Sequence, residues 1–183
     1  MTKTDISRIA VEYARRFPAD ADTVHELRQL IAISAAITSR TEFRGHITCG
    51  GIVVDRDRGR ILMIHHAILD RWLFPGGHVE PGDATVRDVA IREIAEETGI
   101  GRDRLVDPGD WLDRIPLHID RHTIPANPGK GEPTHPHFDF RYLFYGSPVP
   151  VLLQAEEVKD WAWVEPSRTP APMHARFHQL GIV

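Results

Sequence analysis

Apolar residues recur every three to four positions near the start of the chain, which is the spacing of an amphipathic helix. The pattern runs over residues 5–16 and again over 23–38, and Pro18 separates the two stretches. Because proline does not continue a helix, we expect a helical hairpin here. We interpret residues 1–40 as a helical extension in front of a main domain that spans residues 41–183.

The pattern changes to that of strands after this hairpin. β-branched runs at 46–54 and 60–64 flank a turn-prone segment over 55–59, which has two aspartates and ends in glycine, and this predicts an antiparallel pair. A Pro- and Gly-rich loop over 75–83 then leads into a helical pattern over 85–98, and Gly99 follows as a C-cap. Most of the candidate chemistry lies in this unit of strand, loop and helix.

Further strands are expected at 111–119, 138–145 and 161–164, followed by a short C-terminal helix. The segment 124–133 holds too many prolines and glycines for a helix or a strand. This order of elements predicts an α+β fold.

Composition and charge narrow the classes of partner. The 183 residues carry a net charge of −4, without a long run of one sign, so we expect no polymeric nucleic acid as partner. Cys49 is the only cysteine, which excludes an internal disulfide and a multi-thiolate zinc site. The first residues lack a secretory signal, and no apolar run approaches the roughly 20 residues of a membrane span. We therefore expect a cytoplasmic protein without a membrane partner.

Three glutamates are concentrated on one side of the predicted helix. Glu93, Glu96 and Glu97 stand at positions i, i+3 and i+4, which share one face, while neighbouring apolar residues fall on another arc. Like charges at this spacing repel, so a cation is expected to offset them. Mg²⁺ is the natural occupant, because it prefers oxygen ligands. The glycines of the preceding loop allow backbone groups to approach the same place.

These residues resemble the Nudix box. Its second half matches in full, at Arg92, Glu93, Ile94, Glu96, Glu97, Gly99 and Ile100. Gly77 matches the opening glycine of the box, but Asp83 stands where the family has glutamate, and eight residues rather than seven separate it from the arginine. We expect Asp83 to cap the helix N-terminus instead of binding a metal. With the flanking strands, the resemblance extends over residues 46–165.

The resemblance implies a Nudix fold, in which a mixed β-sheet lies between helices. It implies hydrolysis of a phosphoanhydride bond, in a nucleoside diphosphate linked to another moiety, with Mg²⁺ as cofactor and Mn²⁺ as an alternative. The implied metal ligands are the carbonyl of Gly76 and the carboxylates of Glu93, Glu96 and Glu97, with Arg92 orienting Glu93. Glu93 is the first choice of general base, and Glu157, on a later loop, is the alternative.

A histidine-rich segment supplies further candidates for substrate binding. As an extended strand, residues 135–142 place His135, His137, Asp139 and Arg141 on one face and aromatic residues on the other. Such a face could bind phosphate or a metal-bound water. A zinc site would need a third or fourth ligand, which the sequence does not place. Three more candidates for substrate contact lie elsewhere, at Arg44, Arg71 and His78.

Two other functions fit the same scaffold. Isopentenyl diphosphate isomerase resembles Nudix proteins and uses a cysteine, and Cys49 is the only thiol here. A non-catalytic module that binds a nucleotide metabolite is the second alternative, although the box acids are retained. The N-terminal hairpin could also form a homodimer contact or cover the cleft.

Overall fold

The central strand β1 (His46–Asp55) organises the sheet in this computed structural model, which describes residues 1–147 and 158–182. β1 pairs in parallel with β6 (His135–Gly146) and antiparallel with β2 (Ile61–His66) and β4 (Gly76–His78). The sheet path is β3-β2-β1-β6-β5, with β4 added to β1 and β7 to β2. The remaining elements are α1 (Lys3–Arg16), α2 (Ala21–Ile33), β3 (Arg71–Leu73), α3 (Val86–Thr98), β5 (His118–Ile124), β7 (Val158–Val164) and α4 (Ala171–Leu180).

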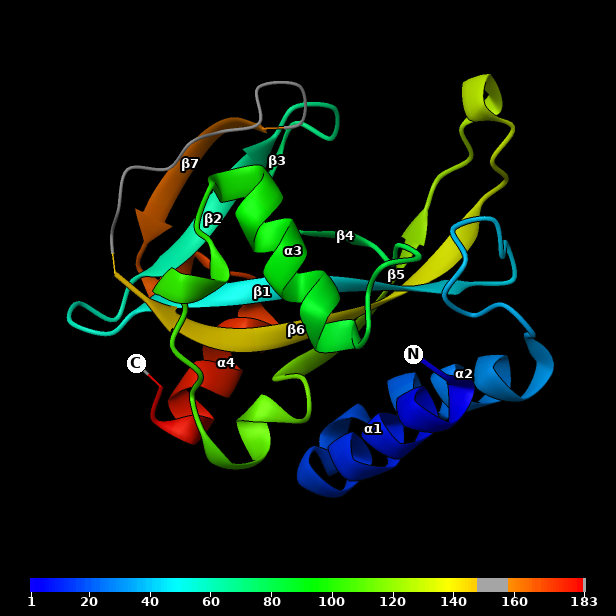
Figure 1. Cartoon of the computed structure of the whole chain (residues 1–183), viewed down its shortest axis with the longest axis horizontal. Coiled ribbons are helices and arrows are strands. Elements are labelled where there is room, and N and C mark those ends of the chain that lie inside the picture. Colours follow the sequence, from blue (N-terminus) through cyan, green and yellow to red (C-terminus); the bar gives the residue numbers. More distant parts are fainter. Residues whose placement is uncertain (148–157, 183) are drawn as a thin grey trace.

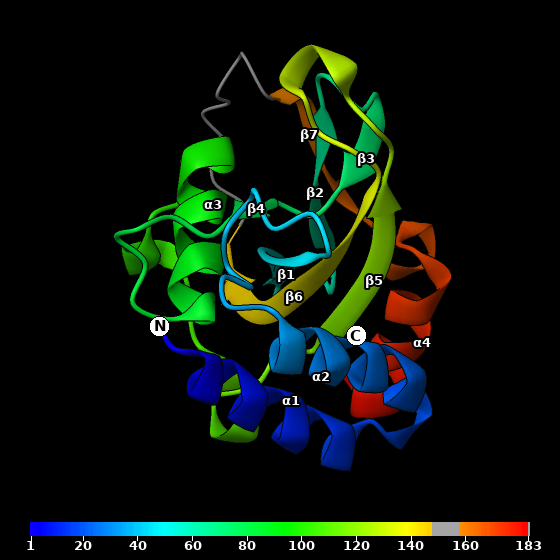
Figure 2. The ribbon, with the colours of Figure 1, turned by 90° about the vertical axis from the view of Figure 1, so that its right-hand side faces the viewer.

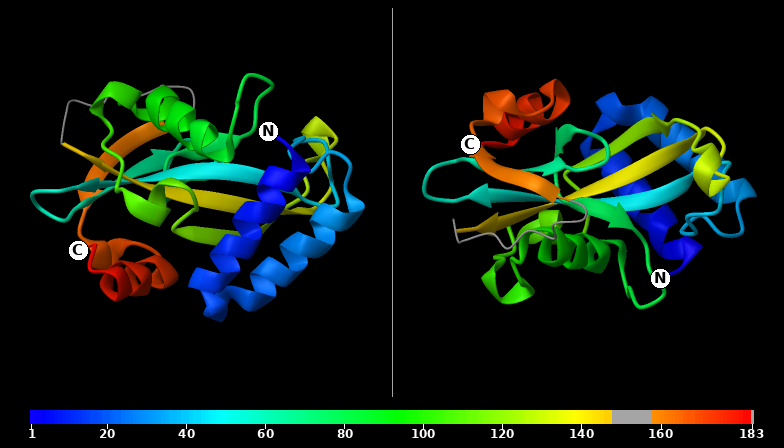
Figure 3. Two further views of the ribbon diagram at one scale, coloured as in Figure 1. Left: turned by 60° about the horizontal axis from the view of Figure 1, so that its bottom comes forward. Right: turned by 90° about the horizontal axis from the view of Figure 1, so that it is seen from above.

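Helices cover both faces of this sheet, so the predicted α+β arrangement of a mixed sheet between helices is confirmed. Seen from above, α3 lies on one side of the strands and α4 on the other (Figure 1; Figure 3, right). α3 approaches β1 very closely, because a Cβ atom on Gly51 would lie 2.1 Å from Cδ1 of Ile94. Glycine at this position therefore allows the helix to rest directly on the strand.

The N-terminal hairpin forms as expected and packs on the rest of the chain. α1 and α2 lie side by side near β5 (Figure 2). Tyr13 and Leu27 are fully buried in the same hydrophobic cluster as Phe138 of β6. The apolar stripe of the hairpin therefore packs into the core of its own chain. The hydroxyl of Tyr13 also accepts the amide of Ile119 at 3.1 Å. The division at residues 40 and 41 and the homodimer stay predictions.

Two predicted elements were wrong in part. α2 ends at Ile33 instead of continuing to residue 38, because the hydroxyl of Ser34 accepts the amide of Ala36 and starts a local turn. The segment 111–119 is a strand only in its last residues. Its first part belongs to a 3-10 turn, Asp110–Asp113, since Gly109 and Asp110 have positive φ and the Asp113 carboxylate accepts the Gly109 amide.

None of the helices in the described residues is both long enough and apolar enough to cross a bilayer.

Candidate active site

Helix α3 (Val86–Thr98) agrees with the predicted helix over 85–98, but its capping residue is not the predicted Asp83. Thr85 is the N-cap, and its hydroxyl accepts the amide of Asp88, whose carboxylate accepts the Thr85 amide in return. This capping box fixes the start of the helix two residues after Asp83. At the other end Gly99 adopts the left-handed conformation, with φ of 69°, so the predicted C-cap is confirmed.

Asp83 pairs with Arg92 instead of capping the helix, which corrects the sequence-based prediction. Its two carboxylate oxygens accept Nε and Nη2 of Arg92, each at 3.1 Å. The carboxylate also accepts the amide of Glu80 at 2.7 Å, which folds the loop back toward the helix. In this loop, which is one residue longer than the family pattern between positions 83 and 92, Asp83 lies beside the arginine and Thr85 caps the helix.

Arg92 lies at the centre of the site and connects its parts. Nη1 donates to Oε1 of Glu93 at 2.9 Å and to Oε2 of Glu96 at 2.8 Å. Nη2 donates to the carbonyl of His78 at 2.7 Å, which joins α3 to β4. Burial alone would lower the pKa of Arg92, but the hydrogen bond with Asp83 and the charge of Glu93 outweigh it and raise the pKa above its usual value. The guanidinium therefore remains a fixed cation among these acids.

The glutamates differ in exposure. Glu93 and Glu97 are buried, at 7% and 2% relative exposure, whereas the side chain of Glu96 is 46% exposed. Oε2 of Glu97 accepts the backbone amide of Gly76 at 2.8 Å. A Cβ atom on Gly77 would come within 2.4 Å of Oε1 of Glu93. The glycines thus allow β4 to lie directly against the buried acids.

The chemistry of these donors fits a hard divalent cation. Glu93 and Glu97 are buried carboxylates, and the glycines of β4 bring its backbone next to both of them. One guanidinium nitrogen bridges Glu93 and Glu96, which brings those two acids within reach of a single cation. Carboxylate and carbonyl oxygens are the ligands that Mg²⁺ prefers.

His46, His78, His135 and His137 form a histidine-rich face on the side of the sheet away from α3. Side chains alternate along a strand, and Gly51 of β1 and Gly77 of β4 face α3, so His46 and His78 face away from it. In the parallel register His137 lies opposite His46. The expected shared face of β6 is confirmed by contacts between His135 and His137 and, further along, between Asp139 and Arg141. The histidine-rich face is therefore on the side of the sheet away from the glutamates of α3.

Asp139 and Arg141 belong to one polar network. Nε of Arg141 donates to Asp139 at 2.8 Å, and Nη2 donates to Asp120 of β5 at 2.9 Å. Thr48 donates to the other oxygen of Asp139 at 3.2 Å. The charges of Asp139 and Asp120 raise the pKa of Arg141 against the effect of its burial. Both residues are thus tied to neighbouring strands.

The other predicted substrate contacts are dispersed. His78 joins the histidine-rich face, where burial first and then the charge of His46 lower its pKa to about 4. Arg44 is bound by Glu42 and donates to the carbonyl of Ile33, which ties a loop to the end of α2. Arg71 is exposed on β3, two strands from β1. Glu157 lies outside the described residues.

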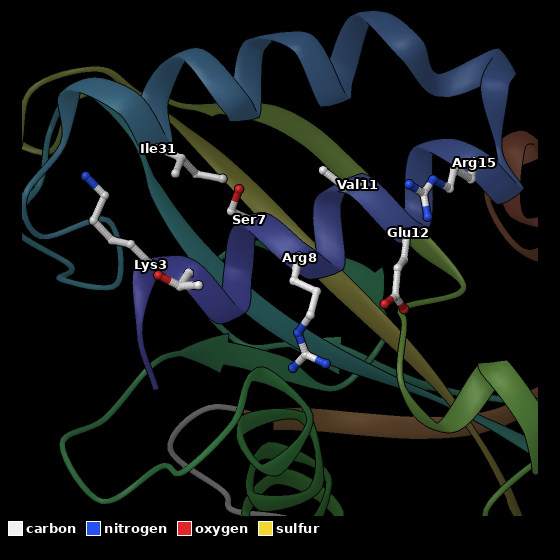
Figure 4. Close-up of a pocket in the computed structure, with 8 residues that line it drawn as sticks. Lys3, Ser7, Arg8, Val11, Glu12, Arg15 and Ile31 are labelled. Atoms are coloured by element: carbon white, nitrogen blue, oxygen red, sulfur yellow. The ribbon is translucent and has the colours of Figure 1, made fainter.

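Two further features bear on where chemistry can occur. Cys49 is fully buried, and burial raises the pKa of its thiol well above the usual value, which disfavours a catalytic thiolate. A surface hollow is lined mainly by α1, with Ile31 contributed by α2 (Figure 4). A second hollow lies against α3, and its lining includes Asp83 and Arg92. The second hollow shares Asp83 and Arg92 with the site, but its lining does not include Glu93, Glu96 or Glu97.

Solved structures share this fold. The chain resembles the C. elegans Ap4A hydrolase binary complex with a TM-score of 0.55 and 23% identity, over 74% of this chain and 94% of that one. It also resembles the E. coli dihydroneopterin triphosphate pyrophosphohydrolase with a TM-score of 0.54 and 15% identity, over 73% of this chain and 92% of that one. At these identities the likeness supports the fold alone.

Curated relatives and a family model extend the comparison to sequence. An RNA pyrophosphohydrolase of Erythrobacter litoralis is 28% identical over 134 residues, which cover 67% of this chain and 77% of that protein. One of Pseudomonas putida is 32% identical over 120 residues, 62% of this chain and 73% of that protein. The NUDIX domain model matches residues 46–180, well over half of the chain. The chain therefore belongs to the Nudix family, a membership that supports hydrolysis of pyrophosphate bonds.

Proposed function

We propose that the chain is an Mg²⁺-dependent hydrolase whose metal ligands are the carbonyl of Gly76 and the carboxylates of Glu93, Glu96 and Glu97. One observation carries the proposal. Arg92 bridges Glu93 and Glu96, while the amide of Gly76 holds Glu97 from the strand side. We infer that the metal binds between these three acids and the backbone of Gly76.

The metal and the residues around it would have different roles in hydrolysis. When bound, the metal would polarise a phosphoryl oxygen and lower the pKa of a coordinated water. Glu93 would accept the proton of the attacking water, a role that its hydrogen bond from Arg92 supports by orienting the carboxylate. Asp83 acts through Arg92, because it orients the guanidinium from the loop side. Glu157 remains the alternative base.

The proposed substrate is a nucleoside diphosphate linked to another moiety. The similarity to RNA pyrophosphohydrolases favours a second candidate, the 5′-triphosphate end of an RNA. The net charge of −4 argues against extensive contact with an RNA backbone but not against contact with its terminal phosphates. Both substrates present the same pyrophosphate bond to the acids of α3.

A parallel assay tests this proposal. ADP-ribose, dinucleoside polyphosphates, nucleotide sugars, nucleoside triphosphates and a short 5′-triphosphate RNA would be incubated with the chain and Mg²⁺, and the products resolved. We expect one class to be cleaved, with loss of cleavage in Glu97→Gln and retention in Glu165→Gln, a control for charge removal at an exposed site. Tight binding of a substrate without cleavage would favour the non-catalytic alternative.

A further inference from the structure

Three buried histidines meet on the sheet face opposite α3, outside the proposed active site. His46 begins β1, and His135 and His137 begin β6, with His46 and His137 directly opposite each other in the register. Their relative exposures are 0%, 4% and 7%. One ligand atom from each lies within 4.8 Å of the others. His46 is the third residue that the sequence could not add to the pair on β6.

The hydrogen bonds of two of these rings define where their lone pairs lie. Nδ1 of His46 contacts the carbonyl of Glu42 at 3.2 Å, and Nδ1 of His135 contacts the carbonyl of Pro133 at 2.7 Å. A carbonyl only accepts, so both Nδ1 atoms carry the proton, and both Nε2 atoms present a lone pair. This backbone contact through the second nitrogen is the arrangement that orients metal-binding histidines.

The Nε2 atom of His46 is a buried polar atom that lacks a hydrogen-bond partner within residues 1–147 and 158–182. A buried nitrogen without a hydrogen-bond partner is unfavourable in free energy, so its position calls for a ligand. The ring centroid of His46 lies 5.1 Å from that of His135 and 4.3 Å from that of His137. The unsatisfied nitrogen therefore belongs to a ring at the centre of the histidine cluster.

The spacing of the cluster fits tetrahedral coordination. Zinc–nitrogen bonds of about 2.0–2.1 Å at tetrahedral angles separate two ligand nitrogens by roughly 3.3 Å. The Nε2 atoms of His135 and His137 are 3.2 Å apart. Small rotations of the rings would complete the site.

We propose that His46, His135 and His137 form a transition-metal site that binds Zn²⁺ with one coordination position left for water or a further group. Imidazole nitrogens suit zinc and not Mg²⁺, so this site differs in ligand type from the carboxylates of α3. It also lies on the opposite face of the sheet. The ring of His78 borders it, with centroids 5.2 Å from His46 and 5.3 Å from His137.

A bound metal would fasten the starts of β1 and β6 and the loops that lead into them. The segment before β1 is held through Glu42, and the one before β6 through Pro133. β4 connects this region to the active site, because the carbonyl of His78 accepts Arg92. We expect zinc to stabilise the fold without replacing Mg²⁺ in hydrolysis.

The zinc titration requires a variant of the chain, called the background below, that lacks a second pair of histidines able to bind zinc. His174 and His178 lie one turn apart on α4, with Nε2 atoms 2.9 Å apart, and could bind zinc themselves. The tag-free double variant His174→Ala/His178→Ala, stripped with a chelator, would be titrated with zinc chloride at millimolar Mg²⁺. We expect one zinc per chain, and retention of that zinc when Glu97→Gln is added.

Adding His46→Ala or His137→Ala to this background should weaken zinc binding by more than the roughly 10- to 100-fold cost of losing an outer-shell partner. X-ray absorption at the zinc edge of the background itself, which keeps all three ligands, should show imidazole nitrogens at about 2.0 Å. Absence of zinc binding by the folded background, unchanged affinity in His46→Ala, or a shell made of oxygen would each overturn the proposal. The absorption spectrum decides even if the histidine variants do not fold.

Discussion

The backbone amide of Gly76 donates to Oε2 of Glu97 at 2.8 Å, which joins β4 to α3 beside the buried acids. A Cβ atom on Gly76 would lie 2.8 Å from Cα of Gly50, so this close approach requires glycine. The carboxylate is therefore oriented by backbone that is paired with β1. The proposed carbonyl ligand and a proposed carboxylate ligand are fixed relative to each other before any metal binds.

Replacing Glu97 with glutamine should lower turnover without destabilising the fold. The amide oxygen of glutamine can still accept the Gly76 amide, so we expect the thermal midpoint to change little. Turnover should fall on the order of 100-fold or more, because a lost metal contact is worth several kcal/mol of transition-state stabilisation. Steady-state kinetics together with thermal unfolding measure both. Activity equal to that of the unsubstituted chain would remove Glu97 from the site.

A side chain at Gly77 should displace the carboxylate of Glu93, unlike one at Gly82 in the same loop. In Gly77→Ala the new Cβ would press on the carboxylate of Glu93 at 2.4 Å, while at Gly82 no heavy atom lies within 4 Å. We expect Gly77→Ala to weaken Mg²⁺ activation and lower turnover, and Gly82→Ala to leave both unchanged. The Mg²⁺ concentration for half-maximal activity is the readout, and equal values for the two variants would contradict this geometry.

Asp83 and Arg92 should behave as one positioning unit. Asp83→Asn removes charge from the carboxylate that holds Nε and Nη2, and Arg92→Lys removes the planar fork altogether. We expect each single variant to lower kcat with little change in KM. The double variant should lose less than the product of the two effects, since the residues act through the same contact. Fully multiplicative losses in a double-mutant cycle would show that they act separately.

Asp20 should make the docking of the N-terminal hairpin sensitive to acid. Its burial raises the pKa, but hydrogen bonds with His118, Tyr13 and Arg176 outweigh that effect and hold the pKa well below the usual 3.8. Because the folded-state pKa is depressed, the stabilisation is complete above pH 3.8 and is lost as the pH falls through the folded-state value.

The variant Asp20→Asn should therefore lower the free energy of unfolding by about 2 kcal/mol near pH 7, the scale of hydrogen bonds to a charged group. Its disadvantage relative to the unsubstituted chain should shrink progressively below pH 3.8. Asp22→Asn, at an exposed position close by, is the control. Denaturant unfolding at several pH values tests this, and an equal loss at pH 7 and in strong acid would contradict it.

Local patterns predicted the elements whose interactions are close in sequence. The spacing of the glutamates and Gly99 fixed both the helix and its end, because helical periodicity and C-capping depend on neighbouring residues. Asp83 was misassigned because its partner, Arg92, is a tertiary contact across a loop of altered length. Two acceptable caps stood close together, and the sequence alone did not rank Thr85 above Asp83.

Contacts between distant strands were beyond a local pattern. The segment 135–142 showed that His135 and His137 share a face, but His46 joins them only through the parallel register of β1 and β6. Parallel pairing has no signal in either strand by itself. Likewise Trp111 was expected in a strand, whereas it lies in a turn with its ring centroid 5.7 Å from that of Phe17 in the N-terminal hairpin. Such tertiary packing overrides local β propensity.

Crystals of the chain soaked in Mn²⁺, with anomalous scattering recorded for the metal, test the central claim most directly. We predict an anomalous peak between β4 and α3, about 2.1–2.2 Å from the carbonyl of Gly76 and from carboxylate oxygens of Glu93 and Glu97. A structure in which these acids point apart, with manganese bound elsewhere or not at all, would contradict the proposed metal site.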